Sequence, residues 1–124
     1  MTSKASVLIV DDEFGVRESL RMLLKSHYEI FTAQDGEEAL EVLKERKIDL
    51  ITLDLNMPKL SGIETLREIR KIDAEVPVII ITGYGTQKDE EETRQYGVTD
   101  FIPKPFNTSK IISVIDGILG ERIE

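Results

Sequence analysis

The sequence predicts an α/β domain with a doubly wound, five-stranded parallel sheet, and two observations carry that prediction. Short aliphatic runs alternate with longer segments of helical periodicity along the whole chain, which is typical of repeated strand–helix–strand units. The runs also differ in composition, and this difference assigns each one a place in a sheet. Because 124 residues match the size of one ordinary domain, we expect residues 1–124 to form a single unit.

Five runs are expected to form strands: Val7 to Val10, Tyr28 to Ala33, Leu50 to Leu53, Val76 to Ile81, and Phe101 with Ile102. The first, third and fourth are dominated by aliphatic residues, as central strands buried on both faces should be, whereas the second mixes polar and apolar residues. The fifth is followed by Pro103, which cannot donate to a ladder and therefore favours an edge. The simplest arrangement is the strand order 2-1-3-4-5, a flavodoxin-like (βα)5 fold.

Five helices are expected between and after these strands. Phe14 to Ser26 and Glu37 to Arg46 each place aliphatic residues on one face, and Ser61-Gly62-Ile63-Glu64 is a capping box that predicts the start of a third helix. The fifth helix is expected after Asn107. The fourth, Gln87 to Tyr96, contains no aliphatic residue. A helix without an apolar stripe gains little from packing, so we expect it to be the least protected of the five. The alternative is a solvated acidic helix held by Tyr96 and by i,i+4 pairs such as Glu90 with Arg94.

Composition excludes several functions. Sixteen Lys and Arg against 24 Asp and Glu give a formal net charge of -8, which argues against direct nucleic-acid binding. The chain has no cysteine, which excludes disulfides, thiolate metal sites and a cysteine nucleophile. No apolar run approaches the roughly 20 residues that span a bilayer. We therefore expect a soluble, cytoplasmic domain that does not bind membranes.

Polar residues follow the strand ends that this order brings together. Asp11 and Asp12 follow the first strand, Asp54 the third, Thr82 the fourth and Lys104 the fifth. Ligands of such sheets bind outside the carboxyl ends of the strands, at the switch point between strands one and three. Three carboxylates there repel one another unless a cation neutralises them, and Mg2+ accepts carboxylate, water and phosphate oxygens. The pattern predicts a Mg2+ site that also binds a phosphate group.

The chain resembles the receiver domains of two-component response regulators, the CheY-like family, over nearly its whole length. The resemblance depends on four motifs: Val7-Leu8-Ile9-Val10-Asp11-Asp12-Glu13, Leu53-Asp54-Leu55-Asn56-Met57-Pro58, Val78 to Gly83, and Phe101-Ile102-Pro103-Lys104-Pro105-Phe106. It implies that Asp54 is the phosphoacceptor and that Asp11 and Asp12 hold Mg2+ together with Asp54 and the backbone carbonyl of Asn56. It also implies that Lys104 contacts the phosphoryl group.

The same resemblance implies a conformational switch. Thr82 corresponds to the switch hydroxyl and Phe101 to the switch aromatic, and the bond preceding Pro105 is cis in the family. Phosphorylation would then alter the face formed by the fourth helix, fifth strand and fifth helix. The implied partners are a sensor histidine kinase or phosphotransfer protein and a downstream output domain or protein, with the chain a monomer or a phosphorylation-dependent dimer. Such a domain is a signalling phosphoacceptor, which catalyses only its own phosphorylation and autodephosphorylation and is not an enzyme in the usual sense.

Three other functions agree with only part of this pattern. A haloacid-dehalogenase-like Mg2+ phosphohydrolase also uses an aspartate nucleophile, but it needs a second acid two residues further on, where Asn56 stands. A flavodoxin-like cofactor binder needs a phosphate loop after the first strand, where Asp11 and Asp12 would repel the phosphate. A receiver-like scaffold that works without phosphorylation is disfavoured by the complete set of acids.

Overall fold

The computed structural model describes residues 4–83 and 85–123. Five strands form one sheet: β1 (Ser6–Val10), β2 (Glu29–Ala33), β3 (Leu50–Leu53), β4 (Val78–Thr82) and β5 (Asp100–Pro103). All neighbouring strands are parallel and their order is β2-β1-β3-β4-β5. The predicted fold class and strand order are confirmed, and the two strands expected at the edges lie there.

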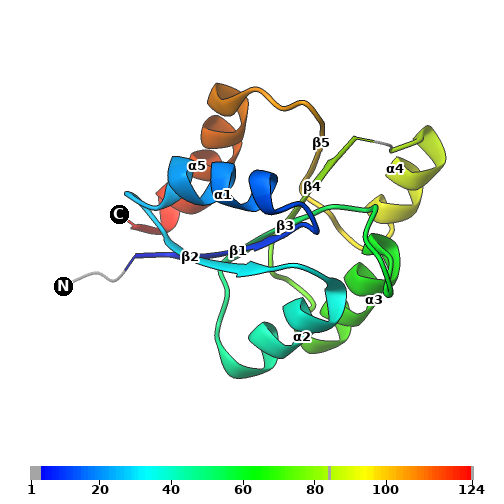
Figure 1. The fold of residues 1–124 in the computed structure, drawn as a ribbon. Helices are drawn as coiled ribbons and strands as arrows, with labels where there is room; N and C mark the ends of the chain where they lie inside the picture. The colour runs from blue at the N-terminus through cyan, green and yellow to red at the C-terminus, as the bar shows by residue number, and fades with distance from the viewer. Residues whose placement is uncertain (1–3, 84, 124) are drawn as a thin grey trace.

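Five helices connect and follow the strands: α1 (Phe14–Leu24), α2 (Gly36–Glu45), α3 (Gly62–Ile72), α4 (Gln87–Arg94) and α5 (Thr108–Ile123). Figure 1 shows α1 and α5 on one face of the sheet and α2 and α3 on the other. Four of these helices begin at side-chain caps, and ahead of α5 the cap is Asn107, whose Oδ1 accepts from the Lys110 N–H. Asp35 accepts from the Glu38 N–H ahead of α2, while Ser61 and Thr86 form capping boxes with Glu64 and Asp89. These caps satisfy backbone donors that a helix start leaves unpaired.

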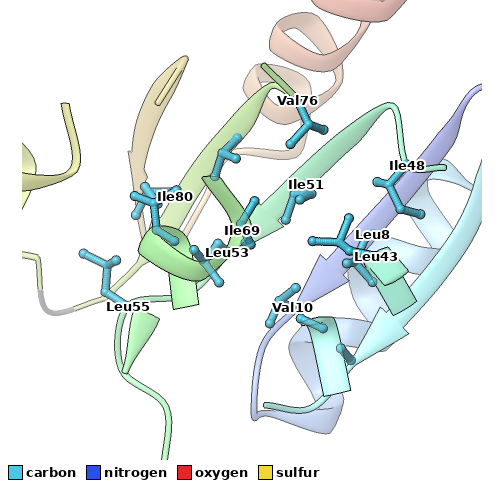
Figure 2. Packing of buried hydrophobic residues seen from close by; sticks show 14 residues of the cluster. Leu8, Val10, Leu43, Ile48, Ile51, Leu53, Leu55, Ile69, Val76 and Ile80 are labelled. Atoms are coloured by element: carbon cyan, nitrogen blue, oxygen red, sulfur yellow. The ribbon is translucent and has the colours of Figure 1, made fainter. Parts of the chain in front are cut away.

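The helices cover the sheet with two separate hydrophobic clusters. Successive side chains of a strand point to opposite faces, so Leu8 and Val10 of β1 join one cluster while Val7 and Ile9 join the other. The first cluster packs against α2 and α3, and Figure 2 shows it with Leu43 of α2 and Ile69 of α3 over the strands. The second packs against α1 and α5. Burial on both faces explains the aliphatic composition of the central strands.

Some element limits differ from those predicted. The fourth strand was expected at Val76 to Ile81 but begins at Val78, because Pro77 has no N–H to donate to a ladder. It includes Thr82, which pairs in register with Pro103 at the end of β5. Thr82 therefore lies on the last position of its strand and not after it. The fourth helix ends at Arg94, two residues before the expected limit.

Among residues 4–83 and 85–123, we find no helix long and apolar enough to cross a membrane.

Candidate functional site

Two aspartates lie at the carboxyl ends of the central strands. Asp11 follows β1 and donates its N–H to Ala33 O at 3.1 Å, and Asp54 follows β3 and donates to Val10 O at 3.0 Å. These bonds continue the sheet ladders by one residue and fix both backbones. Both side chains are buried. Neighbouring parallel strands thus deliver two carboxylates to the same edge of the sheet, as the strand order predicted.

Lys104 joins these carboxylates from the end of β5. Its Nζ lies 2.8 Å from Asp11 Oδ2 and 3.3 Å from Asp54 Oδ2. The backbone is held as well, because the Lys104 N–H donates to Thr82 O at 2.9 Å and the Lys104–Pro105 peptide bond is cis. The lysine side chain is only 14% exposed. Its ammonium is therefore committed to the acids and does not extend into solvent.

The charges of the site do not balance. Burial raises the pKa of Asp11 above its ordinary value, and hydrogen bonds from Lys104 and from the Glu13 N–H offset only part of this rise. Burial alone would lower the pKa of Lys104, but the hydrogen bond to Asp11 and the charges of Asp11 and Asp54 outweigh it, so the pKa is raised. The lysine stays protonated, yet one ammonium cannot neutralise several carboxylates.

Additional acids complete a cluster that fits a hard cation. Carboxylate oxygens of Asp11, Asp12, Glu13 and Asp54 lie within 4.8 Å of one another. A cleft of about 330 Å³ opens beside them and is lined by Asp12, Glu13, Asp54, Asn56, Gly83 and Lys104. All donors are oxygens, the ligands that Mg2+ prefers, and the excess negative charge favours a divalent ion. These residues could hold a metal ion, and the structure brings together the three aspartates predicted as ligands.

Asn56 lies at the mouth of the cleft. Its N–H lies 3.2 Å from Asp54 Oδ1, a contact that fixes the orientation of the carboxylate, and its side chain is exposed. The two oxygens of Asp54 therefore have different neighbours, a backbone amide on one side and an ammonium on the other. Such a fixed carboxylate can act on a group that enters the cleft.

Thr82 and Phe101 lie on the neighbouring strands β4 and β5, and Thr82 directly precedes Gly83, which lines the cleft. Within the described part of the chain, the Thr82 hydroxyl is buried and has no hydrogen-bond partner. A methyl group added at Gly85 would collide with the Phe101 ring and with Thr82 Cγ2, so the three residues are closely packed. An unpaired buried hydroxyl is uncommon, and one beside a polar cleft can donate to a ligand there.

Two contacts of the site escaped prediction. Glu13 belongs to the first motif, where no role is predicted for it, but its Oε1 lies 3.2 Å from Lys104 Nζ. Arg17 of α1 donates from Nη1 to Asp11 O at 2.8 Å and anchors the turn after β1. The proximity of Glu13 to Asp12 in the sequence could have indicated a role for Glu13. Nothing in the sequence pattern distinguishes Arg17 from an ordinary exposed arginine.

Fold and site together define a class of protein: a flavodoxin-like domain with an acidic cleft at its switch point and a lysine in contact with the acids. Comparison with known sequences identifies the family. The sequence model of the response regulator receiver domain matches residues 7–116. The chain belongs to this family and is a CheY-like receiver domain of two-component signalling.

Individual relatives agree with this assignment. A transcriptional regulatory protein CpxR homolog of Haemophilus influenzae is 42% identical, over 93% of this chain and 50% of the relative. The chemotaxis protein CheY of Thermotoga maritima is 38% identical, over 90% of this chain and 95% of the relative. A CheY-like receiver structure from Methanospirillum hungatei superposes with a TM-score of 0.92 at 27% identity, covering 96% of both chains. The chain thus spans about half the length of the first regulator and nearly all of the CheY protein.

Proposed function

We propose that Asp54 accepts a phosphoryl group from a phosphohistidine on a sensor histidine kinase or phosphotransfer protein. The observation that carries this proposal is the carboxylate of Asp54, which is buried, bordered by Lys104 Nζ and by the Asn56 N–H, and turned to the cleft. A carboxylate is a sufficient nucleophile here, because phosphoryl transfer depends mainly on positioning and on neutralisation of charge.

In the transfer, an oxygen of Asp54 attacks phosphorus and forms an acyl phosphate. The phosphorus–nitrogen bond of the donor breaks, and its electron pair stays on the imidazole. A donor ring protonated on its other nitrogen leaves as neutral histidine. Autodephosphorylation is then attack by water on the same phosphorus, which releases inorganic phosphate and restores the carboxylate.

We propose Mg2+ as the cofactor, held by Asp11, Asp12, Asp54 and the backbone carbonyl of Asn56. The support is the cluster of oxygen donors within 4.8 Å and its excess negative charge. When bound, Mg2+ would neutralise charge on the phosphoryl oxygens and on the acids. The chain's own contribution is to fix Asp54, to keep Lys104 charged beside it, and to hold the cleft open to a donor.

Thr82 and Phe101 are proposed to convert the modification into a change of shape. The phosphoryl group adds acceptor oxygens to the cleft, by analogy with phosphoserine. The unpaired Thr82 hydroxyl would donate to one of them, and its movement would free space beside the Phe101 ring. The face formed by α4, β5 and α5 would respond and control an output domain or a partner protein. We propose that residues 1–124 form this one phosphoacceptor domain in the cytoplasm, as a monomer or a phosphorylation-dependent dimer.

The test is incubation with Mg2+ and acetyl phosphate, followed by intact-mass measurement. The wild type and a control variant, Asp100→Asn, should gain the mass of one phosphoryl group, because Asp100 lies outside the acidic cluster. Asp54→Asn should gain none. The adduct should be removed by hydroxylamine and should not form when EDTA removes the metal.

An undiminished adduct on Asp54→Asn, or one that resists hydroxylamine, would contradict the assignment of Asp54. An adduct that forms equally well in EDTA would contradict the metal assignment alone.

A further inference from the structure

Glu13 occupies an unusual position beside the cleft. It is the N-cap residue of α1, but its side chain makes no capping hydrogen bond. Its Oε1 lies instead 3.2 Å from Lys104 Nζ, a residue 91 positions away in the chain. The Glu13 side chain is 63% exposed, whereas that of Lys104 is 14% exposed. The contact therefore joins an acid at the rim of the cleft to a lysine inside it.

Among the described residues, Lys104 has three carboxylate partners, and of these three Glu13 alone has no part in the proposed reaction. Asp11 Oδ2 is nearest at 2.8 Å, while Glu13 and Asp54 lie at 3.2 and 3.3 Å. Once Asp54 is an acyl phosphate, its bridging oxygen no longer carries a carboxylate charge, and the phosphoryl oxygens become acceptors for Lys104. Glu13 keeps its charge throughout. Glu13 therefore competes for the Lys104 ammonium both before and after phosphorylation.

We propose that Glu13 is a positioning residue that draws Lys104 toward the rim of the cleft and competes with the phosphoryl group for it. This inference rests on the proposed function. Lys104 must exchange an ion pair with Glu13 for contacts with the phosphoryl group, and Glu13 thereby slows formation of the acyl phosphate. Glu13→Gln retains the size of the side chain and the backbone N–H that donates to Asp11 Oδ1 at 2.9 Å, so the turn after β1 is preserved.

The first experiment observes the ion pair directly, without metal or phosphodonor. In protein labelled with 15N at lysine Nζ, the Lys104 ammonium signal should shift in Glu13→Gln and its protons should exchange faster with water. The matched control is Glu18→Gln, which removes an acid on α1 whose partner is Arg21. It should leave the Lys104 signal unchanged. A Lys104 signal that is identical in the wild type and Glu13→Gln overturns the proposal.

The second experiment measures the rate of phosphorylation by acetyl phosphate with Mg2+, followed by intact mass. Glu13→Gln should react about two- to fivefold faster than the wild type, the size expected from the loss of one exposed ion pair. In a Lys104→Met background the same substitution should have no effect, because Glu13 acts through Lys104.

The outcomes separate this inference from the function on which it rests. Equal rates for the wild type and Glu13→Gln, an equal increase in Glu18→Gln, or an increase that persists in the Lys104→Met background each overturn the competition alone. A wild type that accepts no phosphoryl group overturns the proposed function itself.

Discussion

Helices α3 and α4 begin in the same way and are held by different forces. Both start with a capping box, at Ser61 and at Thr86. Helix α3 then buries Gly62, Thr65, Leu66 and Ile69, whereas α4, which is described throughout, buries only Thr93. A cap therefore determines where a helix begins, and the apolar stripe determines how firmly it is attached.

Helix α4 has no apolar stripe, but polar contacts from α3 hold the segment at its C-terminal end. Arg67 Nε donates to Tyr96 Oη at 3.0 Å, and its guanidinium lies 5.9 Å from the centre of the Tyr96 ring. Arg70 donates from Nε to Tyr96 O at 2.6 Å and from Nη2 to Gly97 O at 3.2 Å. We call Arg67 and Arg70 the arginine tether. It fixes the end of α4 that is far from Gly85, Thr82 and the cleft.

The largest effect should come from the apolar stripe of α3. Leu66→Ala removes a fully buried side chain from the cluster that packs on the sheet, so we expect it to lower the free energy of unfolding by about 2–5 kcal/mol. Urea denaturation measures the change. The matched control on the same helix is Ile72→Ala, at a side chain 40% exposed, with an expected change within about 0.5 kcal/mol. Equal losses in both variants would contradict the view that α3 is held by its buried face.

The arginine tether should have the next largest effect. Arg70→Met keeps the aliphatic stem but removes the donors to four backbone carbonyls, those of Tyr96, Gly97, Val76 and Asp73. We expect it to lower the free energy of unfolding by about 1–3 kcal/mol, measured by urea denaturation. In the wild type, the amides of α4 should exchange hydrogen faster than those of α3. In Arg70→Met, this difference in exchange rate should become larger. Lys71→Met is the control, because Lys71 pairs only with the exposed Glu68 among its described contacts. If α4 is as protected as α3, the proposed difference between the two helices is wrong.

The smallest effect should come from the pair on the surface of α4. Glu90 Oε1 lies 2.8 Å from Arg94 Nη2, one helical turn away. Glu90→Gln should lower the free energy of unfolding by only about 0.3–0.5 kcal/mol, and the loss should disappear at high salt because exposed pairs are screened. Thermal unfolding at two salt concentrations measures it. A salt-independent loss of several kcal/mol would mean that α4 depends on its own surface charges more than on the arginine tether.

Local sequence features predicted the elements because each has a local physical cause. Pro103 predicted an edge strand because it lacks a donor, and Ser61 with Glu64 predicted the start of α3 because their side chains pair with backbone donors nearby. The acids of the site were found because parallel strands place their carboxyl ends at one edge of the sheet. That argument needs the strand order and no detail of side-chain conformation.

Most contacts that escaped prediction depend on long side chains that reach across the fold, whereas Arg17 contacts Asp11 O only six residues away. Glu13 and Lys104 are far apart in the sequence, and only the folded sheet brings them to 3.2 Å. Arg70 lies in the last turn of α3, where basic residues commonly complement the helix dipole, and Arg67 lies in the middle of the helix, where an arginine is ordinary on a solvent-facing side. Their partners in the Tyr96 to Gly97 segment appear only when α3 and α4 are packed.

The unpaired hydroxyl of Thr82 has a thermodynamic consequence for any response to a ligand. Burying a hydroxyl without a partner, as the described residues do here, costs about 1–3 kcal/mol, and the domain already bears that cost when it folds. An acceptor that reaches Thr82 therefore forms its hydrogen bond without removing water from the donor. Only the desolvation of the acceptor then opposes that bond, so more of its free energy remains to displace neighbouring side chains.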